Sequence, residues 1–186
     1  MAGEEKLKDA DQKMKRAVEV TREELSSVRT GRATPAILNR VTVDYYGAPT
    51  SINQLASFSV PEPRLLVIQP FDRNSIGQME KAIMQSDLGL TPSNDGNVIR
   101  LNFPPLTEER RKDLIRLVRE RAEEGRVAVR NVRRHTKEEL ERLEREGTIS
   151  EDELSRAEKE LQKLTDRHVA EIDELLSHKE KELMEV

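Results

Sequence analysis

Four arginines lie within nine residues of one segment, RVAVRNVRR, at residues 126–134. They are Arg126, Arg130, Arg133 and Arg134. A guanidinium group binds phosphate or carboxylate oxygens through paired hydrogen bonds, so a run of arginines is typical of an anion-binding surface. The chain as a whole has a formal net charge of −4, so the positive charge of this segment is local.

Charge changes sign along the C-terminal half of the chain. Residues 110–134 contain ten basic and four acidic residues, whereas residues 135–186 contain nine basic and seventeen acidic residues. On a helical wheel at about 100° per residue, basic positions of the first segment share one arc away from the apolar positions. The members of this arc are Lys112, Arg116, Arg119, Arg126, Arg130, Arg133 and Lys137, and only Glu123 interrupts them.

Two interpretations of this arc remain open. It is either a solvated helix face with its own ion pairs or a binding surface for an external anion. Three arginines of the arc have acidic residues at helical spacing: Arg116 has Glu120, and Arg119 and Arg126 share Glu123. Arg130 and Arg133 have no acid three or four residues away, and their basic neighbours repel them by a few tenths of a kcal/mol per pair. This repulsion favours an external anion for these two.

The arc contains no aromatic residue that could stack single-stranded bases. A folded RNA or DNA backbone, held through its phosphates and shape, therefore fits it better. A basic surface alone does not identify the partner.

Several other kinds of chemistry are excluded. The chain has no cysteine, so it forms no disulfide and no thiolate site. Its three histidines have no partner at metal-binding spacing, and no hydrolase or phosphate-loop motif occurs. We expect no enzyme activity, no metal and no cofactor. The lack of a signal peptide and of long apolar runs predicts a cytoplasmic protein without a membrane segment.

Prolines and aromatic residues divide the chain. All eight prolines and all five aromatic residues lie between residues 35 and 105. Proline breaks helix interiors and aromatic residues favour strands, so the flanks are expected to be helical and the middle mixed.

Three amphipathic helices are predicted in the flanks. The first covers residues 4–29, the second follows the N-cap Thr107 and ends near EGTIS, and the third opens with a capping box of Ser150 and Glu153. Their expected core positions are Leu7, Ala10, Met14, Ala17, Thr21, Leu25 and Val28; then Leu114, Leu117, Arg121, Gly125, Ala128, Val132, Thr136, Leu140 and Leu143; then Leu154, Ala157, Leu161, Leu164, His168, Ile172, Leu175 and Leu183. Three such stripes are buried against one another, which predicts an elongated three-helix bundle.

Two core positions carry unusual residues. Glycine inside a helix costs about 1 kcal/mol relative to alanine, and close helix packing explains Gly125 better than a flexible point does. His168 lies on an apolar stripe, so we expect a satisfied or partly buried side chain rather than a ligand.

The middle of the chain has strand composition with glycine and proline between the strands. The predicted strands lie in RVTVDYYGAPTSI, RLLVIQPF and VIRLNF, and PSNDGN predicts a turn before the last of them. One helix is expected in NSIGQMEKAIMQSDLGL. Residues 31–105 are therefore predicted to form a small domain inserted between the first two bundle helices.

Long motifs then give a specific resemblance. They are RTGRATP (29–35), VDYYGAPTSINQLAS (43–57), EKAIMQSDLGLTPSNDG (80–96), PPLTEERRKDL (104–114), RVAVRNVRR (126–134) and QKLTD (162–166), and together they closely resemble the ribosome recycling factor family. The resemblance implies an L-shaped α+β fold, with a three-helix bundle from residues 1–30 and 106–186 and an inserted β/α/β domain from residues 31–105.

The resemblance also implies function. A member of this family binds the large ribosomal subunit, with its 23S-type rRNA, after termination. With elongation factor G and GTP it separates the subunits for another round of translation. We expect a monomer. A helical adaptor or chaperone would explain the bundle but neither the arginine repulsion nor the inserted domain.

Candidate rRNA-binding residues follow from the matched motifs. Arg133 matches the position most closely tied to ribosome binding, and Arg126, Arg130 and Arg134 lie around it. Arg29, Gly31 and Arg32 match a second contact, although basic residues followed by glycine also occur at ordinary helix ends. Acidic or other residues often occupy positions 135 and 136 in the family, so His135 and Thr136 are not expected to be contacts.

The two connections to the inserted domain predict a hinge at Gly31, Pro104 and Pro105. Glycine tolerates unusual backbone angles, and the prolines impose an extended approach to Thr107. A fixed elbow held by packing is the alternative.

Overall fold

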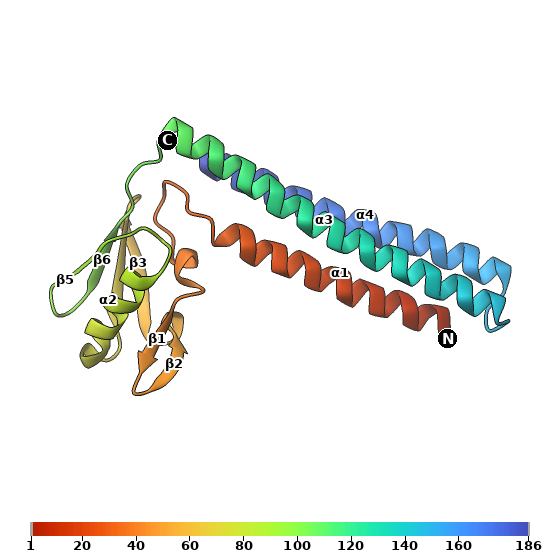
Figure 1. The fold of residues 1–186 in the computed structure, drawn as a ribbon, viewed down its shortest axis with the longest axis horizontal. Coiled ribbons are helices and arrows are strands. Elements are labelled where there is room, and N and C mark those ends of the chain that lie inside the picture. The colour runs from red at the N-terminus through yellow and green to blue at the C-terminus, as the bar shows by residue number, and fades with distance from the viewer. Residues whose placement is uncertain (1, 186) are drawn as a thin grey trace. The chain divides into compact units, whose positions relative to one another are not determined.

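The computed structural model describes residues 2–185 (Figure 1). Within this range the chain forms two compact units. Residues 2–25 and 115–180 make up one, here called the helical unit, and residues 26–114 and 181–185 make up the other, here called the mixed unit. The fold class is α+β, as predicted.

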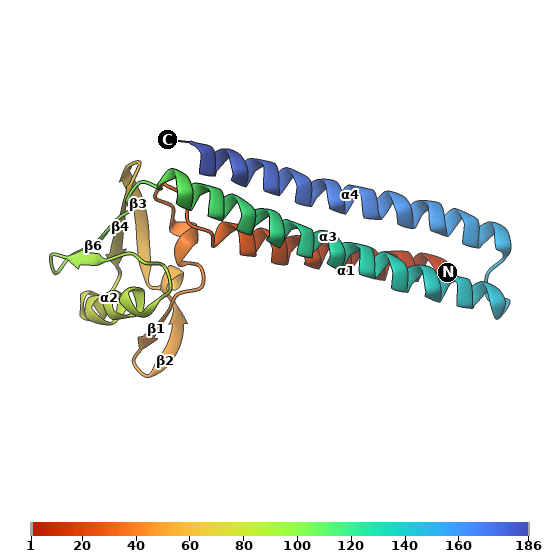
Figure 2. The same cartoon turned by 45° about the horizontal axis from the view of Figure 1, so that its top comes forward.

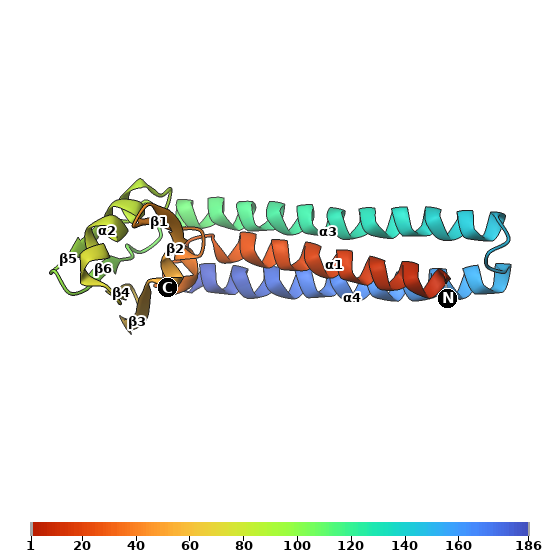
Figure 3. The ribbon, with the colours of Figure 1, turned by 90° about the horizontal axis from the view of Figure 1, so that it is seen from below.

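Three long helices supply the helical unit: α1 (Ala2–Ser26), α3 (Glu108–Arg145) and α4 (Glu151–Met184). Figures 2 and 3 show them side by side, with α3 antiparallel to the other two. No helix in the described range is long and apolar enough to cross a membrane.

The predicted helix caps are confirmed. The backbone N–H of Arg110 donates to Thr107 Oγ1 at 3.1 Å. The capping box of α4 is reciprocal: Ser150 N–H donates to Glu153 Oε2 at 2.8 Å, and Glu153 N–H donates to Ser150 Oγ at 3.1 Å. These bonds satisfy helix-end donors that have no partner within the helix.

The core of the helical unit follows the predicted stripes on α1 and α4 closely and on α3 only in part. Its buried members are Ala10, Met14, Val18, Ala122, Val129, Leu140, Ile149, Ala157, Leu161 and Ile172. On α3 the expected Ala128 is exposed, whereas its neighbour Val129 is fully buried. Arg121 lies at the edge of the stripe, where its charge pairs with Glu24 of α1 at 3.6 Å, so the buried line passes through Ala122 instead.

Gly125 marks a close approach of all three helices. A methyl group at this position would collide with Thr21 Oγ1 of α1 and lie 3.2 Å from Ile172 Cδ1 of α4. The close-packing interpretation of Gly125 is thereby confirmed.

Two antiparallel sheets and one helix build the mixed unit. β1 (Thr42–Tyr45) pairs with β2 (Ala48–Ser51). The larger sheet has the order β3-β4-β6-β5, from β3 (Ala56–Glu62), β4 (Leu65–Pro70), β6 (Ile99–Asn102) and β5 (Pro92–Asn94). The helix α2 (Ile76–Gln85) packs against β1 and β5. Short 3₁₀ helices lie at Pro35–Leu38, Ile52–Gln54 and Arg73–Ser75.

The core of the mixed unit is separate from that of the helical unit. It comprises Ile37, Leu38, Val41, Val43, Ile52, Ala56, Leu66, Ile68, Met79, Ile83, Leu90, Ile99, Leu101 and Phe103. The three predicted strand segments contain β1, β2, β4 and β6, whereas β3 and β5 were not predicted. β3 is an edge strand in which Ser57, Ser59 and Pro61 interrupt the apolar residues, and β5 lies inside the predicted turn segment.

Candidate nucleic-acid interface

The four arginines of residues 126–134 all project from α3 within the helical unit. Arg126, Arg130 and Arg133 are spaced four and three residues apart, so they share one face of this helix. Arg134, one turn after Arg130, lies beside them. The helix therefore positions the group, and the contacts of each side chain decide what it is available to bind.

Arg126 is held by acids within the helical unit. Its Nε donates to Asp173 Oδ1 of α4 at 2.6 Å and its Nη1 to Glu123 Oε2 at 2.9 Å, and only 17% of the side chain is exposed. Burial on its own would lower the pKa of Arg126, but the hydrogen bonds to Asp173 and Glu123 outweigh it and raise the pKa. Arg126 therefore ties α3 to α4.

Arg130 corrects one sequence prediction. We expected it to have no acid within reach, yet its Nη1 lies 3.4 Å from Glu123 Oε1, two helical turns earlier. A residue seven positions away lies two turns along the same helix face, and an extended arginine side chain reaches that far. Half of the side chain, 51%, remains exposed. Glu123 serves Arg126 and Arg130 together while Asp173 also pairs with Arg126, so the contact of Arg130 with Glu123 is the weaker of the two that this acid makes.

Arg133 and Arg134 are the arginines of this segment without an internal partner. Nowhere in residues 2–185 does an acid or hydrogen-bond acceptor pair with either guanidinium group. Arg134 is exposed and Arg133 is partly exposed. Both side chains are therefore available to an external anion.

The remaining members of the arc differ from expectation in their partners. Arg119 pairs with Glu180 of α4 at 2.7 Å instead of with Glu123. Arg116 forms no ion pair with Glu120 or with any other acid in the described chain. Lys112 pairs with Glu108 at 3.4 Å, and Lys137 approaches Glu141 at 3.9 Å.

The second group of candidate contacts belongs to the mixed unit. Arg29 donates from Nη2 to the carbonyl oxygen of Pro104 at 2.9 Å, which joins the two connecting segments. Burial, together with the charge of Arg110, lowers the pKa of Arg29. Arg32 pairs with Glu185 at 3.0 Å and stays 64% exposed. A Cβ at Gly31 would meet nothing within 4 Å, and its φ is not positive, so this conformation does not itself require glycine.

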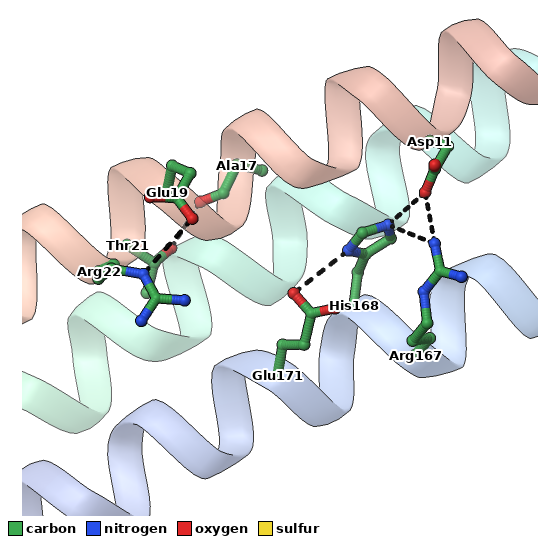
Figure 4. Close-up of polar contacts among 8 residues, drawn as sticks. All are labelled: Asp11, Ala17, Glu19, Thr21, Arg22, Arg167, His168 and Glu171. Atoms are coloured by element: carbon green, nitrogen blue, oxygen red, sulfur yellow. Dashed lines mark hydrogen bonds and ion pairs between the residues drawn. The ribbon is translucent and has the colours of Figure 1, made fainter.

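His168 is buried, as its place on the apolar stripe predicts. It is 2% exposed, and its Nε2 lies 2.7 Å from Asp11 Oδ1 of α1, which Arg167 also contacts at 2.6 Å (Figure 4). On the other side of the ring, Nδ1 lies 3.6 Å from Glu171 Oε2. No cluster of residues suited to a metal ion occurs in the part of the chain that the structure describes.

Comparison with known proteins identifies the family. The model of the family "Ribosome recycling factor" matches residues 21–184. The ribosome-recycling factor of Geobacillus kaustophilus is 59% identical over 180 residues, covering 97% of each chain. That of Saccharopolyspora erythraea is 56% identical over 183 residues, covering 98% of this chain and 99% of the relative.

Two solved structures agree with this result. The solution structure of a ribosome recycling factor matches with a TM-score of 0.84 and 48% identity, over 100% of this chain and 99% of that one. Models of the T. thermophilus ribosome recycling factor and the E. coli elongation factor G, bound to the E. coli post-termination complex, include a chain that matches with a TM-score of 0.73 and 49% identity over the whole of both chains. The resemblance drawn from the sequence motifs is confirmed, and the chain belongs to the ribosome recycling factor family.

Proposed function

We propose that this factor binds the large ribosomal subunit of the post-termination complex and, with elongation factor G and GTP, separates the two subunits. Membership of the family establishes a role in ribosome recycling. The choice of subunit and the energy source are the finer parts of the proposal. Models of a similar factor and of elongation factor G bound to a post-termination complex support elongation factor G as the partner in this proposal.

The observation that carries the proposal is the unpaired state of Arg133 and Arg134. These two guanidinium groups lie on one helix and have no acidic partner within the described chain. The closely spaced phosphates of rRNA are anions that they could bind through paired hydrogen bonds. Arg130 adds to this surface because half of its side chain is exposed and its contact with Glu123 is long, at 3.4 Å. Arg126 lies at the edge of the surface, where its main contacts are internal.

Arg29, Gly31 and Arg32 form a second rRNA contact in this proposal. Arg29 uses one nitrogen to bond Pro104, and the guanidinium group retains further donors for a phosphate. Arg32 is largely exposed, and a phosphate would compete with Glu185 for it.

The proposed mechanism includes motion about a hinge at Gly31, Pro104 and Pro105. The helical unit stays anchored by its arginines while elongation factor G moves the part of the mixed unit between the hinge residues, residues 31–105, against the bridges between subunits. Pro104 and Pro105 limit hydrogen bonding and backbone freedom in one connection, and the bond from Arg29 keeps the other connection beside it. GTP hydrolysis by elongation factor G supplies the energy, and the recycling factor itself acts in the cytoplasm as a monomer without a nucleotide.

The deciding experiment combines subunit splitting with binding. Post-termination ribosomes, elongation factor G and GTP are mixed with the wild-type protein or Arg133→Ala, and subunits are separated on sucrose gradients. Binding to isolated large subunits is measured at two salt concentrations. We expect the variant to bind more weakly and to show a smaller salt dependence, by about one unit of slope for one lost phosphate contact.

Arg119→Ala is the matched control. It removes the same exposed side chain type from the same helix, but Glu180 already neutralises that charge at 2.7 Å. It should therefore bind nearly as the wild type does. Unchanged binding of a folded Arg133→Ala protein, or no splitting by the wild-type protein with elongation factor G and GTP, would refute the proposal.

A further inference from the structure

Tyr46 has an unusual backbone conformation at the turn between β1 and β2. Apart from glycines, it is the only residue in the described chain with a positive φ, at 49°, and Gly47 follows with a φ of 85°. Tyr45 pairs with Ala48 across this two-residue turn, which is the geometry that asparagine followed by glycine favours. A tyrosine at this position is strained because its Cβ crowds the backbone.

The strain places a fixed aromatic ring in solvent. The side chain of Tyr46 is 77% exposed. Its edge-to-face contact with Tyr45 has a centroid separation of 4.6 Å, and its hydroxyl donates to Asp72 Oδ2 at 3.0 Å. The carboxylate of Asp72 also raises the pKa of the Tyr46 hydroxyl. Folding gains little from burial of this ring, and a strained residue held in solvent points to a binding role.

A second exposed aromatic residue, Phe71, directly precedes Asp72 in the chain. Its side chain is 72% exposed while its backbone N–H donates to Leu55 at 2.9 Å. Tyr46 and Phe71 are the two most exposed large hydrophobic side chains in residues 2–185. Together with Asp44 and Asp72 they are here called the Tyr46 surface, which combines the turn between β1 and β2, seen in Figure 1, with the segment that follows β4.

The charges of the Tyr46 surface select the kind of partner. Asp44 accepts the Gly47 N–H at 2.9 Å, and Asp72 accepts the Asn74 N–H at 2.9 Å as well as the Tyr46 hydroxyl. These bonds hold Asp72 against the Tyr46 hydroxyl and Asp44 against the turn that carries Tyr46, and Arg73 is the one basic residue directly next to Asp72 in the sequence. Phosphates of RNA would approach carboxylates, which repel them, whereas a cation is attracted both to a carboxylate and to the face of an aromatic ring.

We propose that the Tyr46 surface is a docking site for a protein segment that carries arginine or lysine, with the cationic side chain covering the exposed rings beside Asp72. This inference goes beyond the proposed function, because it assigns a second binding surface to the protein. The arginine surface of α3 binds anions, whereas the Tyr46 surface would bind a cationic partner. The two surfaces use different side chains in different units, so they are tested separately.

The test uses the full chain and a defined probe. A capped nonapeptide of alternating glycine and arginine is titrated into the protein, and the chemical shifts of the aromatic ring protons are followed by NMR. The chain has only two tyrosines and three phenylalanines, so these signals can be resolved. We expect saturable shifts at Tyr46 and Phe71, and binding that is about fivefold weaker for Phe71→Ala, from the loss of one cation–π contact.

Tyr46→Asn is the most informative variant. Asparagine tolerates a positive φ, so the variant should be as stable as the wild type or more stable while binding the peptide about fivefold more weakly. Val60→Ala is the control, since Val60 is an exposed residue of β3 at the end away from Phe71, and it should leave binding unchanged. Three results would overturn the proposal: no saturable ring shifts, equal binding by Tyr46→Asn, or tighter binding of an oligouridine nonamer than of the arginine peptide.

Discussion

His168 on α4 and Asp11 on α1 form a polar contact in the interior of the helical unit. The imidazole Nε2 and the carboxylate Oδ1 lie 2.7 Å apart, and the ring is almost completely buried (Figure 4). The hydrogen bond with His168 is the main reason that the pKa of Asp11 is lowered, and Arg167 contributes as well. Two helices that run in the same direction are thus joined by a contact with a defined dependence on pH.

Asp11→Asn should reduce this dependence. Because folding lowers the pKa of Asp11, the unfolded chain binds the proton more tightly than the folded chain does. The stability that the carboxylate contributes is therefore complete above its unfolded pKa of about 3.9 and is lost as the pH falls through the lower folded value. We expect Asp11→Asn to lower the free energy of unfolding by about 1 kcal/mol at pH 7, as measured by urea titration. Between pH 5 and pH 3, the free energy of unfolding should fall less for this variant than for the wild type.

Asp9→Asn is the control for this measurement. Asp9 belongs to the same helix but pairs with Lys13 on the surface, with 52% of its side chain exposed. Its loss should change stability by only a few tenths of a kcal/mol. If Asp11→Asn behaved in the same way as Asp9→Asn, the contact with His168 would contribute nothing to folding.

Gly125→Ala should destabilise the protein even though alanine favours helices. The new methyl group would overlap Thr21 of α1 and press on Ile172 of α4, and overpacking of this kind costs about 1–3 kcal/mol. Thermal unfolding followed by circular dichroism measures the effect. Combining it with Thr21→Ala, which removes the nearest atom, should restore part of the loss.

Gly77→Ala is the matched substitution in α2. Nothing lies within 4 Å of a Cβ at that position, so the change should stabilise the protein by up to about 1 kcal/mol. Equal responses to alanine at positions 77 and 125 would contradict the importance of close packing at Gly125.

Features set by neighbours within one helix were predictable from the sequence. Thr107, Ser150 and Glu153 cap helices because their side chains reach backbone groups three residues away, which sequence spacing reveals directly. His168 was likewise placed in the core by its spacing from apolar residues.

Partners on another helix were not predictable from spacing. Arg119 contacts Glu180 and Arg126 contacts Asp173, at sequence separations of 61 and 47 residues. The alignment of α3 and α4 along each other decides which residues pair. Only the tertiary structure gives that alignment. β3 was missed because an edge strand needs few apolar residues, and Ser57, Ser59 and Pro61 hide its alternation.

The proposed hinge predicts that a covalent link between the two connections blocks recycling. A cysteine pair placed across residues 27–31 and 103–107 introduces the only thiols in the chain. The oxidised protein should still bind large subunits, since Arg130 and Arg133 are untouched, but it should fail to split post-termination ribosomes until it is reduced. The single-cysteine variants serve as controls, and full splitting by the verified oxidised protein would show that the motion is dispensable.

Substitutions of Arg126 and Arg133 should have different effects, the first on stability and the second on ribosome binding. Arg126 is 17% exposed and bonded to Asp173 and Glu123, so Arg126→Ala should lower the free energy of unfolding by about 1–2 kcal/mol. Arg133 has no internal partner in the described chain, so Arg133→Ala should leave that free energy within about 0.5 kcal/mol of the wild type and weaken large-subunit binding instead. Urea unfolding and co-sedimentation on the same two proteins give both quantities. The opposite result would be that Arg126→Ala leaves stability unchanged and reduces binding as strongly as Arg133→Ala. That result would mean that Arg126 exchanges its contacts with α4 for contacts with the ribosome, and it would contradict a structural role for Arg126.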